Sequence, residues 1–307
     1  MSGTLSNALL LTAPPAAGAL DDAAIALARP FLGGRQVIQE WWKGAGEAWE
    51  ALFLAGAGED LGPLRAGIAA ALAPRPIDVN IIADDIALRR KKLLVADMES
   101  TIIEQECLDE LADYVGLRPR IAAITERAMR GELDFEAALK ERVGLLGGLD
   151  VRVLDELYAN RITLMPGART LVATMRKNGA ICALVSGGFT FFTERVAARV
   201  GFDVQQANTL QIAGGKLAGT VAEPILGREA KLAALERLTR EHRLAPAETI
   251  AVGDGANDLT MIKAAGLGVA FRAKPVVAAA AAASITHGDL TALLYLQGYR
   301  REEFTEL

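Results

Sequence analysis

Hydrophobic and polar positions follow two different patterns along the 307-residue chain. In the first 85 or so residues, apolar runs typical of strands occur at 8–13 and 77–83. Between them, residues 21–31 and 62–72 carry the spacing of amphipathic helices, and an Ala-Pro-Arg-Pro run stops the second helix. The pattern predicts a small α/β domain over residues 1–85.

A cluster of basic residues at 89–92 separates this segment from the rest of the chain. It is followed by 93–96, a continuous apolar run of the kind that a parallel strand buried on both faces needs. The cluster is compatible with a solvated linker or a binding patch, and we favour the linker. We therefore predict a second domain over residues 86–307.

From residue 93 onward, strand and helix patterns alternate, which is typical of a doubly wound α/β fold. The exception is 117–165, where three helical patterns follow one another without a strand, so we expect an all-helical insertion there. Expected strands lie at 93–96, 180–185, 209–213, 216–221, 249–252 and 268–271. Expected helices lie at about 108–115, 118–129, 134–146, 150–161, 168–177, 192–200, 229–242, 259–265 and 276–283.

Composition and charge exclude several classes of function. With 33 basic and 38 acidic residues the net charge is −5, so no positive field exists for nucleic acid. Cys107 and Cys182 are too few for a disulfide framework or a cysteine-based zinc site. His242 and His287 lie far apart in sequence. Without a secretory signal or a membrane-spanning run, we expect a cytoplasmic protein whose chemistry depends mainly on carboxylates.

Polar residues follow three of the predicted strands. In an open parallel sheet, ligands bind beyond the carboxyl ends of the strands, so these positions are the informative ones. The three motifs are Asp97-Met-Glu-Ser-Thr101, Ser186-Gly-Gly188 and Gly253-Asp-Gly-Ala-Asn-Asp258. A lysine, Lys231, lies early in the helix before the third of these strands.

Carboxylates dominate the first and third motifs. Asp97 and Glu99 are two positions apart, so on an extended backbone their side chains point the same way. Such a pair can supply a nucleophile and a proton shuttle. Asp254 and Asp258 add oxygen ligands of the kind that Mg²⁺ takes together with phosphate oxygens and water.

The remaining polar groups point to the same chemistry. Ser186, with glycine amides such as that of Gly187 behind it, and Lys231 can bind phosphoryl oxygens and offset the charge that develops during transfer. A carboxylate nucleophile, a metal ion, a hydroxyl and a lysine together indicate phosphoryl transfer through an aspartyl-phosphate.

Each motif alone has an ordinary explanation. An Asp-x-Glu after a strand is often a helix N-cap, and Ser-Gly-Gly is usually a turn. The third motif is similar to a dinucleotide fingerprint, but its sixth position is Asp258 instead of glycine or alanine. It also lacks the regular acidic ladder and closing glutamate of a calcium loop. All three motifs at successive strand ends outweigh these explanations.

Together the motifs resemble the haloacid dehalogenase (HAD) superfamily, and within it the phosphoserine phosphatases, over residues 92–294. The resemblance implies a HAD-like doubly wound parallel sheet, which is Rossmann-like, with a helical cap inserted at about 117–165. The domain before it weakly resembles the ACT-like regulatory region of bacterial phosphoserine phosphatases. For that domain we favour a packing or homodimer-forming module, and an amino-acid-sensing site stays open.

The resemblance also implies a role for each motif residue. Asp97 would be the nucleophile, and Mg²⁺ would be held by Asp97, the main-chain carbonyl of Glu99 and Asp254. Ser186 and Lys231 would grip the phosphoryl group, with Gly187 beside them. Asp258 would support the metal site from outside, and Asn257 would contact the substrate.

Substrate choice depends on four more positions. Phosphoserine carries an ammonium and a carboxylate beside its phosphate, so its pocket should offer one acidic and one basic group. Glu106 and Arg142 match the family positions that bind these groups, and Met129 and Phe135 match apolar cap residues that close over the substrate. Taken alone, both charges are typical of solvated helix surface. The resemblance implies hydrolysis of O-phosphoserine, the last step of L-serine biosynthesis, and leaves the preference for the L or D form open.

One position departs from the family pattern, which usually has aspartate where this chain has Glu99. The carboxylate is retained one methylene further out, so we expect Glu99 to act as general acid and base. Another small phosphomonoester, or an acceptor other than water, stays an alternative. A signalling phosphoacceptor domain also uses an aspartate, Mg²⁺ and a lysine, but Glu99 and the insertion argue against it.

Overall fold

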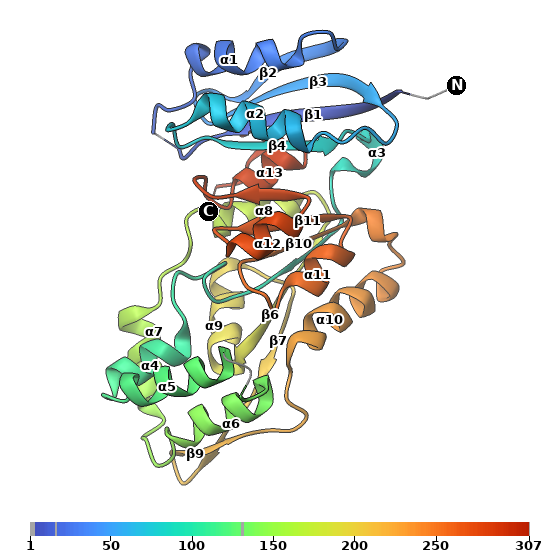
Figure 1. Ribbon diagram of the computed structural model, residues 1–307. Coiled ribbons are helices and arrows are strands. Elements are labelled where there is room, and N and C mark those ends of the chain that lie inside the picture. The colour runs from blue at the N-terminus through green and yellow to red at the C-terminus, as the bar shows by residue number, and fades with distance from the viewer. Residues whose placement is uncertain (1–3, 16, 130–131, 307) are drawn as a thin grey trace.

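The computed structural model describes residues 4–15, 17–129 and 132–306, and its two larger sheets are stacked along the long axis of the molecule (Figure 1). The N-terminal sheet is antiparallel with the order β2-β3-β1-β4, and the chain runs βαββαβ, the split βαβ arrangement. Its elements are β1 (Thr4–Thr12), α1 (Asp22–Ala28), η1 (Arg29–Leu32), β2 (Val37–Gly44), β3 (Ala48–Gly56), α2 (Gly62–Leu72) and β4 (Asp78–Ala83).

The apolar pattern predicted β1, β4 and both helices but missed β2 and β3. β2 is an edge strand whose first three residues are exposed, so its sequence has no regular alternation of buried and exposed positions. β3 is the reverse case, with six of its nine residues buried and only Gly56 exposed. Its Trp49, Ala51 and Phe53 pack with α1 and α2 on one face of the sheet.

The second sheet is parallel, with the order β12-β11-β10-β5-β6-β7, and it confirms the predicted fold class. Its strands are β5 (Leu93–Ala96), β6 (Ile181–Phe189), β7 (Val204–Asn208), β10 (Thr249–Gly253), β11 (Leu267–Phe271) and β12 (Ala283–Ile285). The helices around it are α8 (Ala168–Lys177), α9 (Thr190–Val200), α10 (Arg228–Glu241), α11 (Leu259–Ala264), α12 (Pro275–Ala280) and α13 (Ala292–Leu296). Short helical turns are α3 (Ile86–Arg89), η2 (Pro246–Glu248) and η3 (Arg301–Glu303).

Both faces of this sheet are covered, as the continuous apolar run of β5 predicts. Leu94 and Ala96 point into a core with α8 and α9, whereas Leu93 and Val95 point into a core with α10 and α11. Two differences from the prediction lie at the sheet edges. The pattern missed β7, and the helix expected at 276–283 ends at Ala280 because Ala283 begins the edge strand β12.

The helical insertion forms a cap at the far end of the molecule (Figure 1). It contains α5 (Arg118–Met129), α6 (Phe135–Gly144) and α7 (Arg152–Arg161), and the predicted N-cap Asp134 accepts the Ala137 N–H at 2.7 Å. Two further parts join it. α4 (Cys107–Tyr114) packs on α5 and α7, and the hairpin of β8 (Leu210–Ala213) and β9 (Lys216–Val221) packs on α6.

Side chains of β4 tie the N-terminal sheet to the edge of the parallel sheet. The Asn80 amide pairs with the backbone of Ser284 in both directions, at 3.0 and 2.8 Å, as a neighbouring strand would. The Asp78 carboxylate accepts the N–H groups of residues 286–288. These bonds satisfy backbone groups at the open edge of β12. They join the N-terminal sheet directly to the edge of the parallel sheet.

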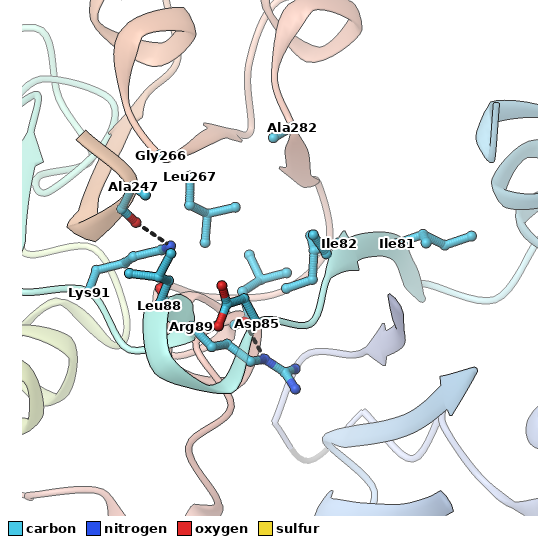
Figure 2. A pocket seen from close by; sticks show the side chains of 12 residues that line it. Ile81, Ile82, Asp85, Leu88, Arg89, Lys91, Ala247, Gly266, Leu267 and Ala282 are labelled. Carbon is cyan, nitrogen blue, oxygen red and sulfur yellow. Dashed lines mark hydrogen bonds between the residues drawn. The ribbon is translucent and has the colours of Figure 1, made fainter. Parts of the chain in front are cut away.

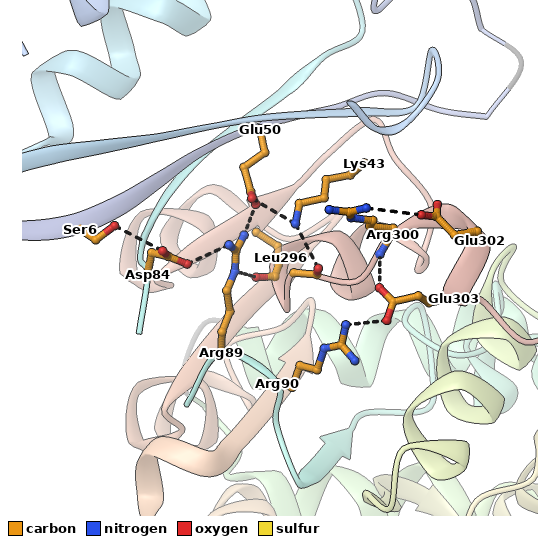
Figure 3. A network of polar contacts seen from close by, with 11 residues as sticks. Ser6, Lys43, Glu50, Asp84, Arg89, Arg90, Leu296, Arg300, Glu302 and Glu303 are labelled. Carbon is orange, nitrogen blue, oxygen red and sulfur yellow. Dashed lines mark hydrogen bonds and ion pairs between the residues drawn. The ribbon is translucent and has the colours of Figure 1, made fainter. Parts of the chain in front are cut away.

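A buried ion-pair network lies beside this contact (Figure 3). The Arg89 guanidinium bridges the carboxylates of Glu50 and Asp84, and the Lys43 ammonium lies 3.1 Å from Glu50. Because a buried charge without its partner is costly, the network favours this one packing of the N-terminal sheet.

A cavity of about 440 Å³ opens near the network (Figure 2). The side chains of Ile82, Leu267 and Leu296 line it, and the Lys91 amine on its rim donates to the carbonyl of Ala247 at 2.7 Å. Within the described residues, no helix is long and apolar enough to cross a bilayer.

Candidate active site

Three motifs meet at the carboxyl end of the parallel sheet. β5 lies between β10 and β6, so the residues that follow these strands are neighbours in space. The Asp97 N–H continues the ladder by donating to the Val252 carbonyl at 3.0 Å. The topology thus places the three polar motifs together, as the strand-end rule predicts.

A buried cluster of charges forms the floor of the site. The Lys231 ammonium, delivered by the first turns of α10, lies 2.7 Å from Asp97 Oδ1 and 2.5 Å from Asp258 Oδ1. Asp97, Asp254 and Asp258 each place a carboxylate oxygen within 4.8 Å of the others. Asp258 Oδ2 also accepts the Gly255 N–H at 3.0 Å, which fixes the third loop. The Lys231 ammonium therefore contacts two of the three clustered carboxylates, those of Asp97 and Asp258.

Burial controls the protonation of these groups. It raises the pKa of Asp97 well above its usual value; Lys231 opposes the shift and Asp258 adds to it. Burial also raises the pKa of Asp254 to about 6, with the Asp258 charge as the second cause. Burial lowers the pKa of Lys231, yet Asp97 and Asp258 outweigh it and raise that pKa overall. The carboxylates outnumber the buried cation, so the cluster favours a further positive charge.

Glu99 lies above this floor and is held by a helix. Its Oε1 accepts the Cys107 N–H at 2.8 Å, where the first turn of α4 presents unpaired N–H groups. Burial, followed by the charge of Glu106, raises the pKa of Glu99 to about 7. A carboxyl group with a pKa near neutrality can both release and accept a proton, as the predicted general acid and base must.

The carboxyl-terminal end of β6 supplies the opposite wall. The strand extends to Phe189, so Ser186-Gly-Gly188 lies within its last residues, whereas the apolar pattern predicted that the motif follows a strand ending at 185. The Ser186 hydroxyl is buried and accepts the Gly188 N–H at 2.9 Å. A Cβ built on Gly188 would lie 2.9 Å from Glu99 Oε2 and 3.1 Å from Ser186 Oγ. Only glycine leaves room here for the carboxylate and the hydroxyl together.

We expect Gly188→Ala to lower kcat/KM for the predicted phosphoryl transfer by about 100-fold, because a shift of the order of 1 Å at reacting groups has this effect. The added methyl group would displace Glu99 from its position over the floor. Steady-state assays of the variant check this. Gly144→Ala on α6, where the nearest atom is 4.0 Å away, is the matched control. Equal activity in both variants would contradict the tight fit at Gly188.

A cavity of about 540 Å³ connects these groups to the cap. The predicted site residues that line it are Asp97, Glu99, Glu106, Phe135, Arg142, Gly187, Asp254 and Asn257. Ser186, Lys231 and Asp258 are buried behind its surface. The Met129 side chain lies outside the described part of the structure.

The cap places one cation and one ring over the cavity. Burial lowers the pKa of Arg142, and the carboxylates of Asp109 and Glu99 oppose this shift. The Arg142 Nε–H donates to the Ala138 carbonyl at 3.2 Å. Within the described part of the chain, the two terminal nitrogens of the guanidinium remain for a ligand in the cavity that Arg142 lines. The Phe135 ring lies against Gly187, where a Cβ would meet it at 3.4 Å.

Sequence reasoning missed several residues of the lining. Ser100, Asp109, Thr125 and Lys274 line the cavity together with apolar side chains. The Lys274 N–H donates to the Asp254 carbonyl at 3.1 Å, and its side chain opens onto the same cavity. Ser100 lies within the first motif, so attention to its hydroxyl could have found it. Lys274 follows β11, a strand end that was not considered.

The sequence of this chain is similar to those of known proteins. Residues 94–263 match the model of the haloacid dehalogenase-like hydrolase family. A phosphoserine phosphatase of Streptomyces coelicolor is 43% identical over 82% of this chain and 62% of its own length. One from a Polaromonas species is 43% identical over 71% of this chain and 94% of its own length. The chain spans about three fifths of the length of the first curated relatives that it matches.

Two solved structures are similar to this chain in fold. A hydrolase of the HAD family from Salmonella enterica serovar Typhi has a TM-score of 0.82 at 28% identity, covering 95% of this chain and 98% of that one. A probable phosphoserine phosphatase from Vibrio cholerae has a TM-score of 0.77 at 32% identity, covering 95% and 86%. Both therefore extend over the N-terminal sheet as well as the parallel one.

Proposed function

Since this chain belongs to the haloacid dehalogenase-like hydrolases, we propose that it is a Mg²⁺-dependent phosphoserine phosphatase. The proposed reaction is hydrolysis of O-phosphoserine to serine and phosphate, the last step of L-serine biosynthesis. One observation carries the proposal: the buried Asp97, Lys231 and Asp258 cluster opens into a cavity lined by an acidic Glu106 and a basic Arg142.

In the proposed first step, a carboxylate oxygen of Asp97 attacks phosphorus and the bond from phosphorus to the serine oxygen breaks. Glu99 gives a proton to that oxygen as serine leaves. In the second step water attacks phosphorus, Glu99 takes its proton, and the bond to Asp97 breaks, which returns both side chains to their starting state. Lys231 balances the charge on the phosphoryl oxygens, and Ser186 and Gly187 bind them.

A divalent cation fits the donor set. The oxygens of Asp97, Asp254 and Asp258 converge within 4.8 Å, and hard cations such as Mg²⁺ prefer carboxylate oxygens. We assign Asp97, Asp254 and the main-chain carbonyl of Glu99 as ligands and Asp258 as their support. When bound, the cation supplies positive charge that offsets the repulsion between these carboxylates and a phosphate ester.

Substrate recognition follows from the upper half of the cavity. We propose that Glu106 binds the substrate ammonium, that Arg142 binds its carboxylate, and that Asn257 contacts the ester side. Phe135, and Met129 by the family resemblance, would close over the ligand. Closure by the cap would exclude water, which strengthens every charge interaction inside the cavity.

The N-terminal segment, residues 1–85, is proposed as a packing domain that can also form a homodimer. The Asp78 and Asn80 contacts and the buried network around Arg89 support its attachment to the catalytic domain of residues 86–307. Cytoplasmic location is part of the same proposal.

Phosphate release from a panel of phosphomonoesters, with and without EDTA, tests the proposed function. We expect rapid, selective turnover of phosphoserine that EDTA abolishes and Mg²⁺ restores. Equal turnover of unrelated phosphomonoesters would favour the alternative of a broader phosphatase. A stable, stoichiometric phosphoprotein without turnover would contradict both.

A further inference from the structure

The backbone between Glu99 and helix α4 is unusual at one residue. Ser100 has a φ of +54°, in the left-handed region that glycine adopts readily and most L-residues rarely adopt. Such conformations are strained and persist where the surroundings enforce them, often at functional sites. Ser100 directly follows Glu99 and lines the cavity, so the strain lies within the site.

The beginning of α4 shows what this backbone turn achieves. Glu106 is the N-cap residue, the position from which a side chain usually accepts an N–H of the first turn. In the described residues its carboxylate makes no such bond, and the N–H of Cys107, the first residue of the helix, donates to Glu99. Glu99 therefore satisfies an N–H of the first turn of α4, whereas the Glu106 carboxylate makes no bond to the helix and lines the cavity.

The Ser100 hydroxyl forms a hydrogen bond with the Glu106 carboxylate. Its Oγ–H donates to Glu106 Oε1 at 2.7 Å, a short bond of the kind that a charged acceptor makes. A serine hydroxyl has one proton to donate, so this bond fixes which way the hydroxyl points. One oxygen of Glu106 is thereby held, and the other is left to a ligand.

The position of this carboxylate matters to its neighbours. The charge of Glu106 raises the pKa of both Glu99 and Asp254, so its distance from them bears on the catalytic floor. A Glu106 side chain that could rotate freely would move a negative charge within an already acidic cavity.

We propose that Ser100 is a positioning residue that holds the Glu106 carboxylate at the place where it receives the ammonium group of the substrate. The proposal rests on the proposed function, because it takes the ligand to be a phosphate ester that carries a primary ammonium. It assigns to the first motif a part in specificity as well as in catalysis.

The test compares two substrates that differ only in the ammonium group. These are O-phosphoserine and 3-phosphooxypropanoate, which is phosphoserine without its amino group. The measured quantity is the ratio of their kcat/KM values. In Ser100→Ala we expect this ratio to fall about tenfold, since a hydrogen bond to a charged group has an effect of this size. Wild-type enzyme with no preference between the two esters would contradict the proposed function instead.

Three companion variants separate the hydroxyl from the backbone. Ser100→Gly removes the hydroxyl but relieves the left-handed strain, so it should lower the ratio as Ser100→Ala does. In a Glu106→Ala background, Ser100→Ala should change the ratio no further. Ser6→Ala is the control, because the Ser6 hydroxyl also donates to a carboxylate, that of Asp84 (Figure 3), and neither residue lines the active-site cavity.

Two outcomes would overturn the proposal. A wild-type ratio in Ser100→Gly together with a reduced one in Ser100→Ala would show that the backbone and not the hydroxyl matters. Independent, additive effects of Ser100→Ala and Glu106→Ala would show that the serine does not act through the glutamate.

Discussion

Replacing Asp97 with asparagine is expected to lower the rate of phosphate release by at least about 10⁴-fold, the scale seen when an enzymatic nucleophile is removed. A carboxamide oxygen is neutral and does not form a stable bond to phosphorus. The local structure should persist, because the asparagine oxygen can still accept the Met98 N–H and face the Lys231 ammonium. The loss should therefore appear in kcat, without a change in the unfolding midpoint beyond a few degrees.

Acid-quenched mass spectrometry gives a second measurement of the same prediction. Wild-type enzyme mixed with substrate should carry a phosphoryl group on Asp97, and the asparagine variant should carry none. Asp97→Ala guards against slow deamidation of the asparagine back to aspartate. Asp113→Asn on α4, where Asp113 forms an exposed ion pair with Arg118, is the matched control and should behave as wild type. Activity of Asp97→Ala within about tenfold of wild type would remove Asp97 as nucleophile.

The position of the buried charge cluster was predictable because the topology of a parallel sheet determines which strand ends are neighbours. β5 is short, apolar and followed at once by Asp97, and any parallel sheet that buries it must bring its end beside those of its neighbours. Motif positions in the sequence were therefore enough to place Asp97, Ser186 and Asp254 at one edge. The same reasoning located α5, α8 and β9 at their observed bounds, since each has a clear periodicity or a turn beside it.

The parts that escaped prediction depend on contacts between distant residues. β2 is an exposed edge strand, which no apolar pattern marks. Glu99 and Glu106 are both acidic residues before a helix, and the sequence gives no sign that the first one caps the helix and the second one faces the cavity. Lys274 joins the site only because β11 ends beside β10, and the Lys274 N–H reaches the Asp254 carbonyl.

Glu99→Gln should lower kcat for phosphoserine by about 10³-fold, within the range that general acid–base groups contribute. The variant isolates proton transfer, because the glutamine oxygen can keep the bond from the Cys107 N–H while its amide group neither releases nor accepts a proton. Oε2 is the oxygen beside Gly188 and the Ser186 hydroxyl, so it is the one placed to serve the reacting groups.

The two steps can be told apart with p-nitrophenyl phosphate, whose leaving group needs no proton. With this ester, Glu99→Gln should release one equivalent of nitrophenol quickly and then stall, because formation of the aspartyl-phosphate is spared and its hydrolysis is not. Glu99→Asp restores the residue that the family usually carries. It should recover activity to within about tenfold of wild type, since the shorter carboxylate still transfers protons but no longer reaches the Cys107 N–H as easily. Turnover of phosphoserine by Glu99→Gln at a near wild-type rate would mean that protons travel by another group. In that case Glu99 would be a cap for α4 that supports the cavity and takes no part in the chemistry.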